Sequence, residues 1–222
     1  MEDYTRSTYY IDADHPEIMA FSRAHIREGA SRIEKAVSLY YAVRDEIRYN
    51  PYSIEPKPAA MKASYILSRG EGYCVAKAVL LAACLRCVAI PARLGFADVK
   101  NHLTTGKLRE KMGTDLFVWH GYTDVCLEDR WVKATPAFNL SLCRAFGVKP
   151  LEFDGTEDSV FHPFDTKGNR HMEYVNDHGR FADLPWDRIL SACRRTYPKY
   201  FEDAGRMEGN FSEEALAETS GK

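Results

Sequence analysis

Apolar residues recur at helical spacing through the first part of the chain, and this pattern predicts three helices. Ser31 followed by Glu34 matches a capping box, so the first helix is expected to begin there and to end before Asn50, which precedes a proline. A second helical run covers residues 60–68. The third run, residues 74–88, is rich in alanine and apolar nearly all round, which predicts a helix buried on every side.

After Pro91 the pattern changes to short apolar runs of the kind that form strands. We predict strands over residues 92–97, 116–127 and 131–134. Glu128, Asp129 and Arg130 predict a hairpin turn between the last two strands. The next stretch is rich in turn residues and predicts loops, and a final helix is expected over residues 185–201. Helices first and antiparallel strands second predict an α+β fold.

The length and composition of the chain suit one domain. Its 222 residues are 45% hydrophobic, which is enough for one sizeable core, and no repeat or low-complexity linker divides them. We expect a single domain over residues 1–204 and a flexible acidic tail over residues 205–222, where small and acidic residues dominate.

Positive and negative charges balance in the sequence. Lys and Arg number 30 and Asp and Glu 32, so the net charge of −2 gives no electrostatic reason to expect nucleic acid or an anionic membrane as a partner. No run of about 18 apolar residues could span a bilayer, and the acidic opening is unlike a secretory leader. We therefore expect a cytoplasmic protein. The pattern carries no signal for an oligomeric state.

The six cysteines are predicted to be free thiols, because the chain is long and three of them lie in the third predicted helix. Cys84 and Cys87 form a C-x-x-C pair, a spacing found in zinc and redox sites. Here the pair closes a buried helix and has no second pair at ligand spacing. A packing role is therefore favoured, and no metal is expected.

Cys74 stands out because it opens the buried helix directly after Gly72 and Tyr73. Unpaired backbone N–H groups and the positive end of the helix dipole should face its sulfur and favour the thiolate. The same N–H groups could stabilise an oxyanion. The alternative interpretation is a small apolar residue at a helix start, and the local pattern fits both.

His120 is the partner that this cysteine would need. It lies inside the apolar strand predicted over residues 116–127, where a histidine that only fills the core is the alternative. A histidine on a rigid strand facing a cysteine at a helix start is the geometry of a Cys/His catalytic pair.

Three ordered elements resemble the transglutaminase-like superfamily, which includes bacterial transglutaminase-like cysteine proteases. The G-x-C turn into a long buried helix, the link from helix to strand, and the histidine strand followed by a W-x-x-x-D-P element are matched by Gly72-Tyr73-Cys74, Ile90-Pro91-Ala92-Arg93, His120, Trp131 and Thr135-Pro136. The resemblance covers about residues 72–136, and the flanks match only in general character.

The resemblance implies a papain-like core in which helices pack on an antiparallel sheet and the nucleophile stands at the N-terminus of a buried helix. Carried over residue by residue, Cys74 is the nucleophile and His120 is the general base. The implied activity is acyl transfer from a peptide or small amide substrate through a thioester, without a cofactor. Hydrolysis is favoured over cross-linking, because excluding water from an acyl-enzyme requires a dedicated closed cleft.

The chain departs from the family pattern at the third catalytic position, where Thr135 replaces the usual Asp. A hydroxyl can hold the histidine tautomer but carries no charge to stabilise an imidazolium. Asn139 could substitute, since an amide serves as orienter in papain-like enzymes. Asp124 shares the histidine strand at an even spacing and so could point to the same face.

The polar residues Asp98 and His102 follow the first predicted strand. Either they cap a turn, or they line the substrate cleft together with Tyr73, with His102 as a reserve acid or base. The sequence thus carries two main hypotheses: a cysteine hydrolase or acyltransferase, and a binding module of the same fold whose catalysis is weakened by Thr135. A C-x-x-C metal or redox protein is a third.

Overall fold

The computed structural model describes residues 2–102, 104–161, 172–202 and 209–220. The described helices are α1 (Pro16–Ala24), α2 (Arg32–Glu46), α3 (Ala63–Arg69), α4 (Cys74–Cys87), α5 (Gly106–Met112), α6 (Leu140–Phe146), α7 (Trp186–Thr196), α8 (Pro198–Glu202) and α9 (Phe211–Ser220), with short 3-10 turns at Glu2–Tyr4 and Pro58–Met61. The strands are β1 (Arg48–Tyr49), β2 (Glu71–Gly72), β3 (Ala92–Asn101), β4 (Leu116–Leu127), β5 (Arg130–Ala134) and β6 (Met172–Phe181).

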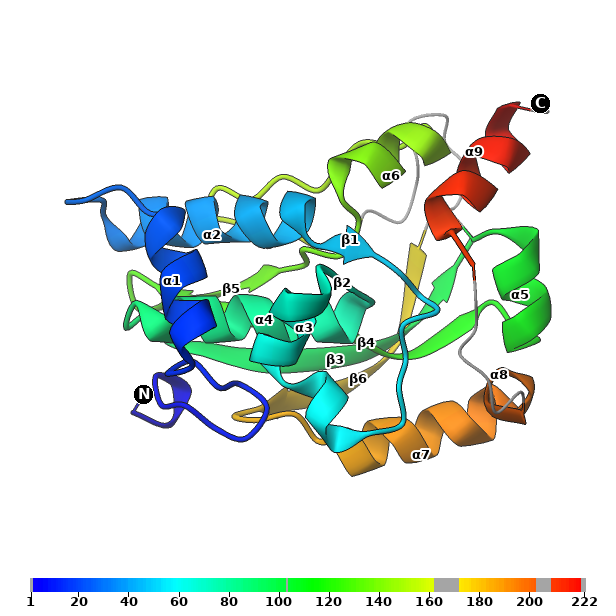
Figure 1. The fold of residues 1–222 in the computed structure, drawn as a ribbon, viewed down its shortest axis with the longest axis horizontal. Coiled ribbons are helices and arrows are strands. Elements are labelled where there is room, and N and C mark those ends of the chain that lie inside the picture. Colours follow the sequence, from blue (N-terminus) through cyan, green and yellow to red (C-terminus); the bar gives the residue numbers. More distant parts are fainter. Residues whose placement is uncertain (1, 103, 162–171, 203–208, 221–222) are drawn as a thin grey trace.

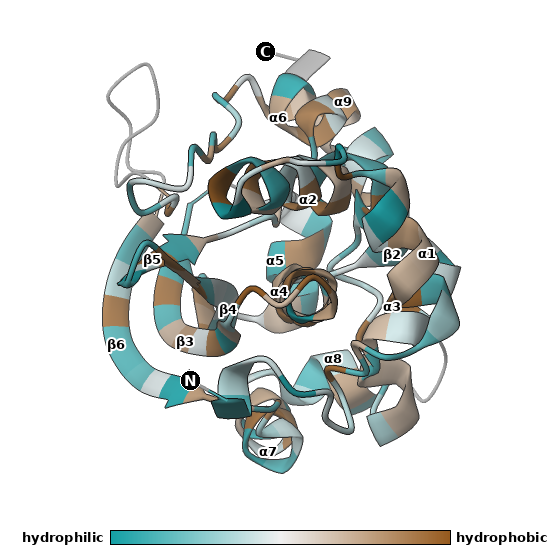
Figure 2. Ribbon diagram, turned by 90° about the vertical axis from the view of Figure 1, so that its left-hand side faces the viewer, coloured by the Kyte–Doolittle hydropathy of each residue, from teal (hydrophilic) through white to brown (hydrophobic). Residues whose placement is uncertain are grey.

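Helix α4 forms the centre of the molecule (Figures 1 and 2). A four-stranded sheet in the order β5-β4-β3-β6, antiparallel at every pairing, curves around one side of it. Helices α1, α2 and α3 pack on other sides, and β1 and β2 form a small parallel pair. The predicted α+β fold with helices on an antiparallel sheet is confirmed.

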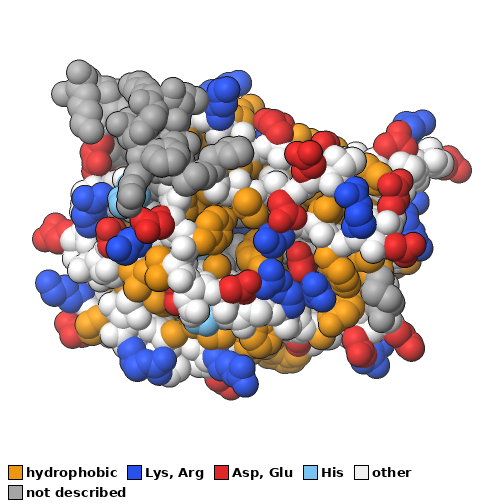
Figure 3. Space-filling model, turned by 180° about the vertical axis from the view of Figure 1, so that it is seen from behind, with side chains coloured by type: hydrophobic (Ala, Val, Ile, Leu, Met, Phe, Trp, Pro, Cys, Tyr) orange, Lys and Arg blue, Asp and Glu red, His pale blue; other side chains and the backbone are white. Residues whose placement is uncertain are grey.

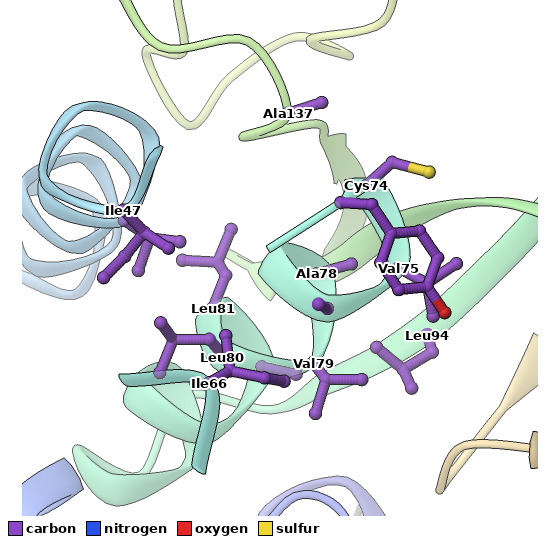
Figure 4. Packing of buried hydrophobic residues seen from close by; sticks show 14 of the residues in the cluster. Ile47, Ile66, Cys74, Val75, Ala78, Val79, Leu80, Leu81, Leu94 and Ala137 are labelled. Carbon is purple, nitrogen blue, oxygen red and sulfur yellow. The ribbon is translucent and has the colours of Figure 1, made fainter. Parts of the chain in front are cut away.

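Burial of α4 is nearly complete, since every residue from Cys74 to Arg86 is buried. Figure 4 shows its side chains beside Ile47, which follows α2, Ile66 of α3 and Leu94 of β3, with Cys74 at the end where the helix begins. Lys77 is also inside, where its Nζ donates to the carbonyls of Arg44 (2.9 Å) and Ile47 (2.6 Å) at the end of α2. Burial holds the pKa of Lys77 well below its ordinary value.

Two local signals identified in the sequence form as predicted. The Ser31 side chain accepts from the Glu34 N–H while the Glu34 side chain accepts from the Ser31 N–H, so the capping box starts α2. Between β4 and β5, Glu128 and Asp129 have φ of 47° and 61°. Positive φ at both central residues is the geometry of a tight hairpin turn that matches strand twist.

Other segments differ from the sequence-based expectation. The loop-rich region yields β6 at the sheet edge, and the single final helix is broken into α7 and α8 at Tyr197, which precedes a proline. Residues 211–220, expected within a flexible tail, form α9, with Phe211 and Ala215 buried against the rest of the molecule. Residues 205–208 and 221–222 of that expected tail lie outside the described residues.

Glycine at two positions lets β4 and β2 approach α4. A Cβ added at Gly121 of β4 would stand 2.9 Å from the Cα of Val75 in the first turn of the helix. A Cβ at Gly72 would stand 2.8 Å from the Cβ of Ala76. Because real Cβ atoms do not approach so closely, Gly121 allows the histidine strand to pack on the helix start, and Gly72 allows β2 to pack on the same helix.

Candidate active site

Cys74 is the first residue of α4 and is 7% exposed. Burial raises the pKa of its thiol to about 11, while the backbone N–H groups of Gly121, Val75 and Cys74 itself act in the opposite direction. The sequence left open whether the helix start stabilises a thiolate here, and in the folded chain desolvation outweighs the helix start in its effect on the thiol pKa. At neutral pH the resting sulfur carries its proton.

His120 lies on β4 and is also buried, at 6% exposed. Burial lowers the pKa of its imidazole to about 4, so the ring is neutral at pH 7. Its Nε2 is buried and has no hydrogen-bond partner among the described residues. A neutral imidazole with a free ring nitrogen is able to accept a proton.

Cys74 and His120 line the same cavity, which has a volume of about 40 Å³. Its other described walls are apolar or aromatic and come from six elements and their links: Tyr49, Pro51, Ile54, Tyr73, Val75, Leu108, Met112, Phe117, Val118, Trp119, Ile189, Cys193, Tyr197 and Tyr200. None of these wall residues is a Lys, Arg, Asp or Glu. The structure therefore brings the two candidate catalytic side chains to one cavity with mostly apolar and aromatic walls.

Thr135 follows β5 and is 1% exposed. Its Oγ1 is buried without a hydrogen-bond partner among the described residues, and its carbonyl accepts from the Tyr40 hydroxyl at 3.2 Å. It is not one of the residues that line the cavity. An orienting bond from Thr135 to His120 is therefore absent from the described part of the chain, and that role stays a prediction.

The two substitute orienters are engaged elsewhere. The Asn139 side chain accepts from the Tyr49 N–H at 3.1 Å and donates to Ser141 at 2.6 Å. The Asp124 carboxylate is 2.9 Å from the Arg93 guanidinium and 3.4 Å from that of Arg180. Neither is hydrogen-bonded to the candidate base in the described structure.

The remaining predicted site residues separate into two groups. Tyr73 lines the cavity as the residue before Cys74, with its hydroxyl 3.7 Å from the Met61 sulfur. His102 has a buried Nε2 without a described partner but does not line the cavity. Asp98 lies on β3, beside the histidine strand, and its carboxylate accepts from the Trp119 N–H of that strand.

The aromatic wall of the cavity, which includes Tyr49, Tyr197 and Tyr200, was not predicted from the sequence. These tyrosines come from β1, from the link between α7 and α8, and from α8, segments that meet only in the folded chain. One signal was present, because Ile189, Cys193 and Tyr197 recur on one side of the final predicted helix.

Other site classes find no support in the described residues. All six cysteines are free, as predicted. Within the described ranges no cluster of three or more His, Cys, Asp or Glu side chains is placed to hold a metal ion. None of the helices in those ranges has the length and apolar character needed to cross a membrane. Seen from behind (Figure 3), the surface mixes acidic and basic side chains, in keeping with the balanced net charge.

A buried helix that begins at a cysteine and packs against a strand bearing a histidine defines a transglutaminase-like core. The model of the transglutaminase-like superfamily matches residues 20–136, more than half of the chain. The chain belongs to this superfamily.

Among solved structures, the chain is similar to a candidate cysteine protease from Cytophaga hutchinsonii, with 14% identity and a TM-score of 0.47 over 79% of this chain and 53% of that one. It is also similar to a candidate protease from Parabacteroides distasonis, with 14% identity and a TM-score of 0.39 over 63% of this chain and 25% of that one. The chain thus spans about half the length of the first and a quarter of the second. No curated protein matches it.

Proposed function

We propose that the chain is a cysteine hydrolase that cleaves peptide-type or small amide substrates through a thioester on Cys74, with His120 as the base. The observation that carries this proposal is the shared apolar cavity, in which a helix-start cysteine and a histidine with a free ring nitrogen both line the wall. Membership of the transglutaminase-like superfamily supports the same roles.

The reaction begins with both groups neutral. His120 accepts the thiol proton as the Cys74 sulfur attacks the carbonyl carbon, and a C–S bond forms. Backbone N–H groups near the helix start, including those that already lower the thiol pKa, face the developing oxyanion. The imidazolium then gives its proton to the leaving amine as the C–N bond breaks. In the second half His120 takes a proton from water as the water oxygen bonds to the thioester carbon. The C–S bond then breaks, the carboxylic acid leaves, and the imidazolium returns the proton to the Cys74 sulfur.

The cavity indicates which acyl groups the site accepts. Its described lining offers no Lys, Arg, Asp or Glu to pair with a charged substrate group. Moving an unpaired charge into such a space costs several kcal/mol or more. We therefore expect uncharged acyl groups next to the scissile bond. Hydrolysis is preferred to transfer to an amine, because transfer would require a dedicated closed cleft that keeps water away from the acyl-enzyme.

A second candidate function is a binding module of the same fold. It is favoured by the third position, where the carboxylate that would stabilise an imidazolium is replaced by Thr135 and where no described carboxylate bonds to His120. The raised pKa of the Cys74 thiol also favours a binding module, because the thiolate is the nucleophilic form. This candidate predicts ligand binding that survives a Cys74→Ala change.

Turnover of a panel of uncharged and charged acyl p-nitroanilides distinguishes the two. The enzyme proposal predicts hydrolysis of uncharged members, reduced at least about 10³-fold in Cys74→Ala. Cys87→Ala is the matched control, because it removes the thiol at the far end of the same helix and should stay within about twofold of wild type. Equal rates in wild type and Cys74→Ala would contradict the proposal and favour the binding module.

A further inference from the structure

The strand that carries His120 contains a β-bulge immediately before the histidine. In the pairing of β3 with β4, Ala97 faces His120 and Val99 faces Phe117. Asp98 alone therefore faces two residues, Val118 and Trp119. Two residues opposite one is the defining feature of a bulge, which bends a strand and re-aims its side chains.

The backbone of Trp119 adopts a conformation that a bulky residue rarely tolerates. Its φ is +55°, in the left-handed region, where a residue with a large side chain costs roughly 1–2 kcal/mol. Such a conformation persists only where the surroundings hold it. Because the bulge directly precedes His120, its backbone geometry affects the direction in which the imidazole points.

Two side chains from other elements hold the bulge by its backbone. The Val118 N–H donates to the Tyr197 hydroxyl at 2.6 Å, and that hydroxyl donates onward to the Leu116 carbonyl at 3.0 Å. The Trp119 N–H donates to Asp98 Oδ1 at 2.9 Å. Both N–H groups of the bulge thus bond to side chains, which take the place of ladder carbonyls.

Asp98 also fixes the Trp119 ring through a third residue. His178 Nε2 donates to Asp98 Oδ1 at 2.7 Å, and the His178 ring stacks on the Trp119 indole with centroids 4.1 Å apart and planes 7° apart. The backbone and the ring of Trp119 are therefore tied to one carboxylate. Asp98 and His178 are both mostly buried, at 16% and 20% side-chain exposure, so water competes weakly for these bonds.

We propose that Tyr197 and Asp98 are positioning residues that lock the Val118–Trp119 bulge and thereby hold the His120 imidazole in line with the Cys74 sulfur. Their role as positioning residues for catalysis rests on the proposed function, whereas their control of the imidazole does not. The Tyr197 ring lines the cavity, but its hydroxyl is bonded to the Val118 N–H and the Leu116 carbonyl, so in this role each residue acts through the backbone that precedes His120.

Tyr197→Phe and Asp98→Ala test this proposal, since each removes one anchor of the bulge. Each should lower kcat at least tenfold with KM changed less than twofold, because the base is misaimed while the cavity keeps its shape. Asp98→Asn keeps an acceptor oxygen for the Trp119 N–H, so it should retain activity within about threefold. A role in folding alone would not separate kcat from KM or give this rescue.

Matched controls remove the same groups elsewhere. Tyr52→Phe deletes a hydroxyl that donates to Glu214 at 2.6 Å, and Asp177→Asn neutralises a carboxylate on the neighbouring strand. The second readout is the Cε1–H NMR signal of His120, assigned by its loss in His120→Gln. The signal should move in Tyr197→Phe and Asp98→Ala and stay in place in both controls.

The outcomes separate this proposal from the proposed function. If wild type shows no turnover, the proposed function fails and the His120 signal alone decides the positioning role. If the signal in Tyr197→Phe and Asp98→Ala stays within the spread of the controls, the positioning role is overturned. If Asp98→Ala does not fold, the His120 signal in Tyr197→Phe decides. A signal at the same position as in the controls then overturns the proposal.

Discussion

The two halves of β4 have the same length but opposite character. Residues 122–125 pair regularly with β3, and residues 123–127 pair with β5. The Thr123 hydroxyl donates to the Ala78 carbonyl of α4 at 2.9 Å, and the Asp124 carboxylate pairs with two arginines. In this half Thr123 and Asp124 thus have polar partners on the helix or inside the sheet.

Residues 116–121 are irregular. They pair with β3 alone, and they contain the bulge, a left-handed Trp119 and the unpartnered His120 Nε2. Buried polar atoms without partners and strained backbone both cost stability, and in native proteins they concentrate where function requires them. The regular half holds the sheet to α4, and the irregular half carries the candidate base.

The largest expected effect concerns the pH dependence of stability in the irregular half. His120 has a folded-state pKa of about 4, below its ordinary value, so the unfolded chain binds its proton first as pH falls. The stability from neutral His120 is complete above about pH 6.5 and is lost as pH falls through 4, for a total of about 3 kcal/mol.

Urea unfolding measures this effect in wild type and His120→Gln. Between pH 7 and pH 5 the wild type should lose about 2 kcal/mol more than the variant. The variant lacks the titrating ring and serves as the control for every other group. Parallel curves for the two proteins would show that the imidazole is not held neutral by burial.

The next largest effect lies in the regular half, at Asp124. Asp124→Ala leaves the Arg93 and Arg180 guanidinium groups without this carboxylate, and we expect a loss of about 2 kcal/mol in the free energy of unfolding. The cost is moderated because both arginines are about a quarter exposed, at 23% and 24%. Asp177→Ala, which removes an exposed carboxylate from the same Arg180, should cost about 0.5 kcal/mol or less.

Chemical denaturation of the two variants checks this ordering. Turnover of Asp124→Ala should remain near that of wild type, because its carboxylate does not bond to His120. A large loss of turnover without a loss of stability would instead assign Asp124 to the catalytic half of the strand.

The smallest predicted effect concerns the third catalytic position. Thr135→Asp installs the carboxylate of the family pattern at a buried site, where it would stabilise the imidazolium that forms during attack. We expect kcat/KM to rise about tenfold, whereas Thr135→Asn, of matched size and without charge, should give no rise. Steady-state kinetics with an uncharged p-nitroanilide provide the measurement. Equal rates in both variants would show that position 135 does not act on the His120 imidazolium.

The sequence predicted β4 with its observed bounds and α4 within one residue, because strong apolar runs and turn signals bracket both. It did not predict β6, whose residues at the sheet edge are mostly exposed and show no apolar alternation. Nor did it predict α9, which depends on Phe211 packing against Phe146 of α6, with ring centroids 5.6 Å apart.

The candidate site was predictable in part for the same reason. Cys74 and His120 are marked by local motifs, and the fold brings both to one cavity. The state of the thiol was not predictable, because the helix start is visible in the sequence whereas the depth of burial is not. The bulge anchors Tyr197 and Asp98 lie 79 and 21 residues from the backbone groups they bind, so only the folded chain reveals them.

Acylation mapping tests the central claim most directly. Wild type and His120→Gln would be treated with p-nitrophenyl acetate at pH 7, quenched, digested and mapped by mass spectrometry. The account predicts a single acetyl group on Cys74 in wild type, none on the other five cysteines, and almost none on Cys74 in His120→Gln. Acetylation spread over several cysteines, or unchanged on Cys74 without His120, would contradict the assignment of these two residues as a catalytic pair.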